Sequence, residues 1–262
     1  MLFLKTFVIS LLISLYGFKK FIYIISICYG LSVATIGAFL LFISTNLTIP
    51  ELILGFLYIA YGLRLSLFLL IREYKHKSYI KKVGNEINST DNMEFFIKLF
   101  IWISVSLLYG CQTSPLTFRT ISNNKNDNLV YIGIAIIIFG FLLEIKADNE
   151  KSNEKKINPN RFVDSGLYKI VRCPNYFGEV IFWTGNYIGG IKIYNGGFQW
   201  LISTFGYFLI IYIMFSAAIR IEIRQNKEYG KDPVYQKYIK HTPILIPFIP
   251  LYSVEKYYWL RG

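Results

Sequence analysis

The stretch LVYIGIAIIIFGFLLEIKA at residues 129–147 decides the fold class of this chain. It contains no charged side chain before Glu144. A run of about 20 apolar residues is long enough for an α-helix to cross the ~30 Å hydrocarbon layer of a bilayer. A helix also satisfies its own backbone hydrogen bonds, as a segment in lipid must. The stretch therefore predicts a transmembrane helix.

Similar runs recur along the whole chain. Of the 262 residues, 54% are hydrophobic and 18% are aromatic, and the mean hydropathy is +0.42. Soluble domains are usually ~45–50% apolar. The predicted spans cover residues 3–18, 21–45, 52–71, 95–117, 129–147, 176–194 and 198–219. We therefore expect an all-α, polytopic integral membrane bundle of about seven transmembrane helices, forming one membrane domain over residues 1–262.

The basic residues predict the topology. The net charge is +12, and Lys and Arg concentrate in segments 72–94 and 148–175 and after residue 219. Positively charged loops stay cytoplasmic, so the N-terminus is expected outside or in the lumen and the C-terminus in the cytosol. This topology suits the endoplasmic reticulum of a eukaryote or the inner membrane of a bacterium. No nucleic-acid recognition module accompanies the charge, so we expect no nucleic-acid partner.

The segment GLYKIVRCPNYFGE at residues 166–179 is the strongest functional signal. Pro174 favours a helix start, and Asn175, Glu179 and Trp183 then follow one another on a single helix face. Polar groups at the mouth of an apolar run are costly unless they bind something. The alternative is a polar cap at the membrane surface. Three cysteines and two histidines offer no disulfide framework and no metal cluster.

This segment resembles the signature of the steroid 5-alpha-reductase-like family of membrane reductases, also called DUF1295. The usual string in that family is close to Gly-Leu-Trp-x-x-Ser-Arg-His-Pro-Asn-Tyr-Phe-Gly-Glu. The resemblance implies an NADPH-dependent reductase whose cofactor-binding C-terminal half covers residues 129–250. It implies that Asn175 and Glu179 contact the nicotinamide and that Trp183 lines the pocket. Cys173 departs from the family, which has a His before the Pro.

The same resemblance implies further cofactor contacts. Asp148 and Lys151 would lie near the adenosine ribose, and Arg220 and Tyr235 would close over the nucleotide. The phosphates need cations, and Arg suits them because its planar guanidinium bonds two oxygens at once. The candidate phosphate ligands are Lys151, Arg161, Arg172 and Arg220, and the motif tyrosines Tyr168 and Tyr176 complete the predicted cofactor site. Any of these cations could instead face anionic lipid.

A second signal lies in the span at residues 52–71. Arg64 lies inside this apolar run, where a charge either snorkels to the surface or marks a functional site. The steroid-reducing branch of the family has a Tyr-x-x-Arg pair here, which Tyr61 and Arg64 reproduce. The resemblance implies that Tyr61 is the catalytic acid on the substrate carbonyl and that Arg64 contacts the cofactor. The acidic residue of that branch in its second span has no counterpart in residues 21–45.

Three functions remain open at this stage. The first is hydride transfer from NADPH to the double bond of an enone-like lipophilic substrate that enters from the bilayer, by a protein that acts as a monomer. The second is an S-adenosylmethionine-dependent methyltransferase of the isoprenylcysteine carboxyl type, which the motif also resembles. The fuller match at Asn175 and Phe177–Glu179 favours the reductase. The third is a receptor or scaffold with a degenerate site.

Overall fold

The computed structural model describes residues 1–75, 93–122 and 127–257. Within these ranges all regular secondary structure is helical, which confirms the all-α prediction. Most of the predicted basic segment 72–94 lies outside the described residues.

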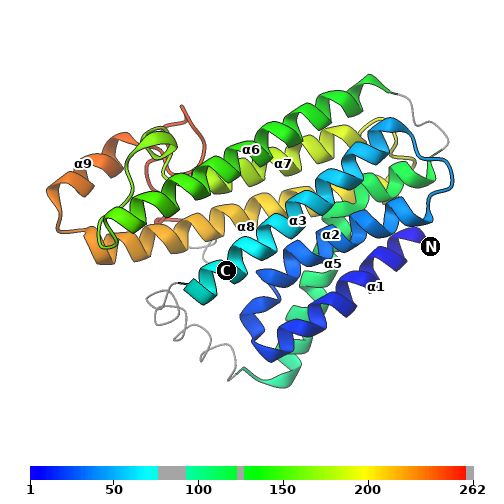
Figure 1. The fold of residues 1–262 in the computed structure, drawn as a ribbon, viewed down its shortest axis with the longest axis horizontal. Helices are drawn as coiled ribbons and strands as arrows, with labels where there is room; N and C mark the ends of the chain where they lie inside the picture. Colours follow the sequence, from blue (N-terminus) through cyan, green and yellow to red (C-terminus); the bar gives the residue numbers. More distant parts are fainter. Residues whose placement is uncertain (76–92, 123–126, 258–262) are drawn as a thin grey trace. The chain divides into compact units, whose positions relative to one another are not determined.

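The helices follow the predicted order and are labelled in Figure 1. They are α1 (Leu2–Ser14), η1 (Leu15–Lys19), η2 (Phe21–Tyr23), α2 (Ile27–Ile43), α3 (Ile49–Lys75), α5 (Phe95–Ile121), α6 (Asn128–Ile157), η3 (Gly166–Lys169), α7 (Pro174–Gly190), α8 (Gly197–Tyr229) and α9 (Pro233–His241).

Five helical stretches are long and apolar enough to cross a membrane. They are Leu2–Lys19, Ile49–Glu73, Phe95–Gln112, Asn128–Ile157 and Gly197–Tyr229. The helices α2 and α7 have 17 residues each, which is fewer than the others. The chain is an integral membrane protein by these helices, but the predicted count of seven spans is not confirmed.

Helices α6 and α8 extend well beyond their predicted ends at residues 147 and 219. They contain 30 and 33 residues. At 1.5 Å per residue they are about 45 and 50 Å long, which exceeds the ~30 Å apolar layer. The added turns are rich in Glu and Lys, which are good helix formers, so the charge that ends the apolar run does not end the helix. These polar helical ends carry several of the site residues described below.

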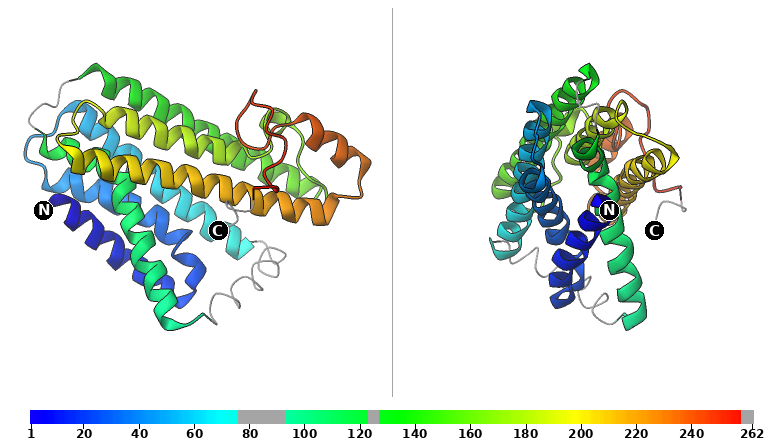
Figure 2. Two further views of the ribbon diagram at one scale, coloured as in Figure 1. Left: turned by 180° about the vertical axis from the view of Figure 1, so that it is seen from behind. Right: turned by 90° about the vertical axis from the view of Figure 1, so that its right-hand side faces the viewer.

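The chain divides into two compact units, each described here by itself. Unit 1 comprises residues 1–134 and 186–207, and unit 2 comprises residues 135–185 and 208–262. In unit 1, α2 packs along α3, and α1 packs against α5 and α2 (Figures 1 and 2). Most of the predicted site residues fall in unit 2.

Unit 2 has its own apolar core, closed by the C-terminal segment. Cys173, Ala218, Ile219, Leu245 and Val254 form this buried cluster. The segment 242–257 folds back on α8, as the red trace in Figure 2 shows. Its backbone pairs with the motif: the N–H groups of residues 172 and 173 donate to the carbonyl oxygens of residues 243 and 244, each at 2.9 Å. The motif is thus held by the end of the chain.

Candidate functional site

The motif begins at a position that only glycine adopts without strain. Gly166 has φ +55°, and a Cβ there would lie 2.4 Å from a carboxylate oxygen of Glu150. That carboxylate accepts the backbone N–H of Leu167 at 2.8 Å and so caps η3. The left-handed backbone and the close carboxylate together explain why the motif opens with Gly.

A second glycine of the motif sets the distance between α6 and α7. A Cβ on Gly178 would lie 2.9 Å from the carbonyl oxygen of Gly140 and from the backbone nitrogen of Glu144. A Cβ on Gly140 would likewise lie 2.6 Å from the carbonyl oxygen of Gly178. Small residues let helix backbones approach this closely in membrane proteins. The contact brings the acidic end of α6 beside the start of α7.

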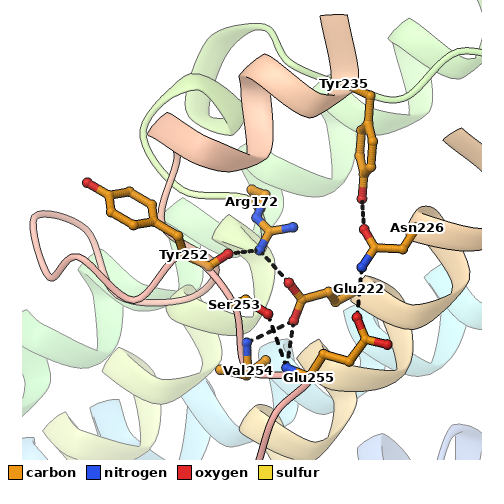
Figure 3. Close-up of polar contacts among 8 residues, drawn as sticks. All are labelled: Arg172, Glu222, Asn226, Tyr235, Tyr252, Ser253, Val254 and Glu255. Carbon is orange, nitrogen blue, oxygen red and sulfur yellow. Dashed lines mark hydrogen bonds and ion pairs between the residues drawn. The ribbon is translucent and has the colours of Figure 1, made fainter. Parts of the chain in front are cut away.

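Arg172 is the most deeply buried of the predicted cofactor cations. Its Nη2 donates to Glu222 Oε1 at 2.9 Å and to the carbonyl oxygen of Tyr252, as Figure 3 shows. The side chains of Arg172 and Glu222 are only 1% and 2% exposed. A buried ion pair of this kind costs several kcal/mol of desolvation per ion, which further hydrogen bonds must offset. Arg172 therefore anchors the C-terminal segment, a structural task that the sequence did not reveal.

The other two nitrogens of the Arg172 guanidinium do not bond to Glu222 or Tyr252. Its Nε and Nη1 are buried and have no hydrogen-bond partner among the described residues. The hydroxyl of Tyr235 donates its hydrogen to Asn226 Oδ1 at 2.9 Å, and its oxygen is still able to accept from the nearby guanidinium. Leaving buried donors without acceptors is costly. These two N–H groups are the feature of unit 2 that best fits an anionic ligand.

Glu222 is a site residue that the sequence analysis missed. Besides Arg172 it accepts the backbone N–H groups of Val254 at 2.9 Å and Glu255 at 3.1 Å (Figure 3). One turn further along α8, Asn226 donates to Glu255 Oε2 at 2.9 Å. The available signal was a lone acid at the end of an apolar helix, in the run Arg220-Ile-Glu222. Nothing in the sequence indicated its partner 50 residues upstream.

Helix α7 carries the predicted nicotinamide contacts. Asn175 and Tyr176 are half-buried, whereas Glu179 and Trp183 are buried, the latter at 2% exposure. Asn175, Glu179 and Trp183 succeed one another at intervals of four residues within one helix, so they share a face. The carboxylate of Glu179 is thus held away from bulk water. Their predicted contacts with a cofactor remain predictions.

Tyr168 of the motif lies close to Asp148 of α6. The hydroxyl of Tyr168 donates to the carbonyl oxygen of Ala147 at 3.4 Å, and Asp148 is buried. Burial raises the pKa of Tyr168, and the nearby Asp148 charge raises it further. Tyr168 therefore stays protonated as a structural donor.

Cys173 is a buried thiol close enough to two cations to feel their charge. Burial raises its pKa to about 11, although the charges of Lys151 and Arg172 act in the opposite direction. The thiol is accordingly protonated at neutral pH and is a poor nucleophile.

The remaining predicted cations do not join this buried centre. Arg161 is half-exposed and pairs with Asp164 at 2.8 Å. Arg220 is exposed, and its Nη1 donates to Ser216 Oγ at 2.9 Å. Each is engaged by a neighbour on its own segment, so neither shares the environment of Arg172.

Tyr235, another predicted cofactor contact, lies in an aromatic cluster. The Phe162 ring lies 5.1 Å from the Tyr235 ring and 5.4 Å from the Tyr238 ring. Burial raises the pKa of Tyr235 to about 12, while the Arg172 charge lowers it in part. Next to this cluster is a cavity of about 380 Å³, lined by Asn158, Pro159, Asn160, Arg161, Phe162, Tyr229 and Asp232.

The predicted catalytic pair lies in unit 1, on α3. Tyr61 is fully buried, and its hydroxyl is 3.3 Å from the hydroxyl of Tyr29. Arg64 is half-buried, with its guanidinium carbon 5.1 Å from the centre of the Phe68 ring. A cation over an aromatic face is the arrangement expected for a partly snorkelling side chain. Its role toward a cofactor stays a prediction.

The helical fold and the buried Arg172–Glu222 pair define a helical membrane protein with a buried polar site in unit 2. The sequence pattern of the family described as "Protein of unknown function (DUF1295)" matches residues 10–242. The chain belongs to this family. The resemblance drawn from the motif is therefore confirmed over most of the chain.

Two plant proteins are similar to this chain. Steroid 5-alpha-reductase DET2 of Gossypium hirsutum is 24% identical over 169 residues, which are 62% of this chain and 60% of that protein. Steroid 5-alpha-reductase DET2 of Arabidopsis thaliana is 26% identical over 121 residues, which are 45% of this chain and 41% of that protein. The aligned part thus spans less than two thirds of either relative. No solved structure matches the chain.

Proposed function

We propose that this protein is a membrane-embedded reductase that uses NADPH to reduce the carbon–carbon double bond of a lipophilic, enone-like substrate. The observation that carries the proposal is Arg172: it lies inside the family motif and is buried, and it keeps two N–H donors without a partner among the described residues. The names of the two relatives support the same class of reaction.

The chemistry of unit 2 fits a dinucleotide phosphate. Glu222 already neutralises the charge of Arg172, so Arg172 would contribute directional donors. Net positive charge would come from Lys151, whose field reaches the same thiol as that of Arg172. The cavity beside Phe162 and Tyr229 offers an aromatic wall with amide and carboxylate groups around it, as a nucleoside requires.

The reaction requires a dry, oriented pocket and an acid. When bound, NADPH would supply the hydride. Asn175 and Glu179 would orient its carboxamide, and Trp183 would exclude water on the same helix face. Tyr61 would donate a hydrogen bond to the substrate carbonyl and give up its proton as the β carbon accepts the hydride. We keep Arg64 as a proposed cofactor contact.

Thermal unfolding of the purified protein with NADPH, NADH or S-adenosylmethionine tests the proposal. A ligand that binds only the folded state adds about 2.7 kcal/mol of stability at a hundredfold excess over its Kd. Arg172→Lys is the sharpest variant, because Lys can keep the ion pair with Glu222 but lacks the planar donors. We expect NADPH to stabilise the wild type, with a Kd raised about tenfold or more in Arg172→Lys and in Asn175→Ala.

Arg224→Ala is the matched control, because this arginine is exposed on the same helix and is not among the predicted cofactor contacts. It should leave the NADPH shift unchanged. A shift with S-adenosylmethionine and none with NADPH would contradict the proposal and favour the methyltransferase alternative. Equal shifts in wild type and Arg172→Lys would show that Nε and Nη1 of Arg172 do not bind the cofactor.

A further inference from the structure

Unit 1 contains a polar segment that the proposed function does not use. In α5 every residue from Cys111 to Arg119 is buried, and this stretch includes Gln112, Thr113, Ser114 and Thr117. It begins at the end of the apolar stretch Phe95–Gln112 and continues beyond it. Polar side chains at such a place are expensive and are by default a sign of function.

Pro115 explains why this part of α5 is open to other partners. Its ring nitrogen carries no hydrogen, so the Cys111 carbonyl loses its helical hydrogen bond. In membrane helices such freed groups are satisfied by neighbouring helices or waters. Gly206 of α8 packs directly on this point, since a Cβ there would lie 2.7 Å from the Cys111 carbonyl oxygen.

A neutral hydrogen-bond chain meets α5 at the next residue. The hydroxyl of Tyr58 donates to Asn186 Oδ1 at 2.6 Å. The Nδ2 of Asn186 in turn donates to the backbone carbonyl oxygen of Gln112 at 2.8 Å. Tyr58, Gln112 and Asn186 are all at most 3% exposed. These two hydrogen bonds hold the backbone of Gln112 in place and do not involve its side chain.

The Gln112 side chain differs from its polar neighbours. Thr113 donates to the Tyr109 carbonyl at 2.8 Å, Ser114 pairs with Ser203 at 2.8 Å, and Arg119 pairs with Asp127 at 2.8 Å. In contrast, both Nε2 and Oε1 of Gln112 are buried without a hydrogen-bond partner among the described residues. A buried polar group left unsatisfied calls for a specific reason, such as a ligand.

We propose that Gln112 is the recognition group of a second binding site, for the hydroxyl group of an uncharged lipophilic ligand. A carboxamide with a vacant donor and a vacant acceptor is complemented by a hydroxyl, which accepts and donates at once. Tyr58 and Asn186 are uncharged, so these two residues do not attract an ionised head group. The site is independent of NADPH, so its test does not depend on the proposed function.

Photocrosslinking in lipid nanodiscs without NADPH tests the site. The probes are 1-hexadecanol carrying a diazirine and the matching hydrocarbon without the hydroxyl. We expect the wild type to label about tenfold more strongly with the alcohol, as one or two buried hydrogen bonds would give, with label on peptides containing residue 58, 112 or 186. Unlabelled 1-hexadecanol should compete.

Gln112→Leu separates recognition from folding. Because it removes an unsatisfied buried group and keeps a similar volume, it should leave the melting temperature equal or raise it, and abolish the preference for the alcohol. Ser114→Ala is the matched control: it breaks the hydrogen bond to Ser203, so it should lower the melting temperature and keep the preference. The proposal is overturned if the wild type labels equally with both probes, or if Gln112→Leu retains the alcohol preference.

Discussion

Among the described residues, each unit buries one arginine whose charge and N–H donors need partners, and the two arginines differ in how many partners they have. Arg119 in unit 1 pairs with Asp127 at 2.8 Å, donates to the Gly189 carbonyl and has further contacts. Arg172 in unit 2 pairs with Glu222 at 2.9 Å and donates to the Tyr252 carbonyl, yet its Nε and Nη1 have no partner among the described residues. Both side chains are 1% exposed.

The difference between the two arginines lies in how completely their hydrogen-bond donors are satisfied. A guanidinium has five N–H donors, and a protein that buries one for stability satisfies as many as geometry allows. Arg119 follows that rule. Arg172 departs from it within the family motif, and this departure supports Arg172 as the proposed cofactor contact.

The largest effect should come from removing the acid beside Arg172. Glu222→Gln leaves a buried guanidinium without its counter-charge, which typically costs about 3–5 kcal/mol. Asp127→Asn is the comparison, and it should cost less, because Asp127 is 13% exposed and water can replace part of its charge. Urea or thermal unfolding in detergent measures both. Equal losses in the two variants would remove the distinction between the two arginines.

A smaller effect is expected in the neutral chain of unit 1. Tyr58→Phe removes the donor to Asn186 Oδ1 and leaves that oxygen buried, at a cost of about 1–3 kcal/mol. The same unfolding assay applies, with Tyr131→Phe as a control, because Tyr131 is exposed. A loss as large as that in Glu222→Gln would show that charge is not what separates the two regions.

A near-zero change in stability is expected when both members of the Arg172 pair become apolar. Replacing a buried ion pair by hydrophobic residues of similar volume is often neutral or stabilising. The double variant Arg172→Met, Glu222→Leu should therefore unfold close to the wild type, while its NADPH shift disappears. Retention of the NADPH shift in a folded double variant would show that the pair serves stability only.

The smallest effect concerns Cys173 and involves reactivity. Its pKa in the folded state is raised to about 11 by burial. The thiolate is thus scarce below that pH, and alkylation by iodoacetamide should rise near pH 11 rather than near the ordinary Cys value of about 8.5. The measurement uses Cys28→Ser, Cys111→Ser protein. Adding Arg172→Met and Glu222→Leu removes two of the three neighbouring charges and leaves Lys151, so a profile that moved strongly would contradict burial as the main cause.

Much of the fold was readable from the sequence. Apolar runs placed every long helix, because a span must be apolar over about 20 residues and helical throughout. The ends of α6 and α8 were placed too early, since the hydropathy falls at Glu144 and Arg220 while the helix continues through good helix formers. The motif marked Arg172, Asn175 and Glu179 as candidates, through their residue types together with the resemblance to the family.

Only the tertiary structure decided which polar groups meet. The sequence could not pair Arg172 with Glu222 or Tyr58 with Asn186, because these partners are 50 and 128 residues apart and a hydrogen bond depends on packing between helices. It could not separate Gln112 from Ser114 either, although the two lie within one turn. Their difference is that one is satisfied and the other is not, and satisfaction is a property of neighbours in space. The sequence by itself determined an all-helical membrane protein of this family, and the structure decided where its buried charges and its vacant donors lie.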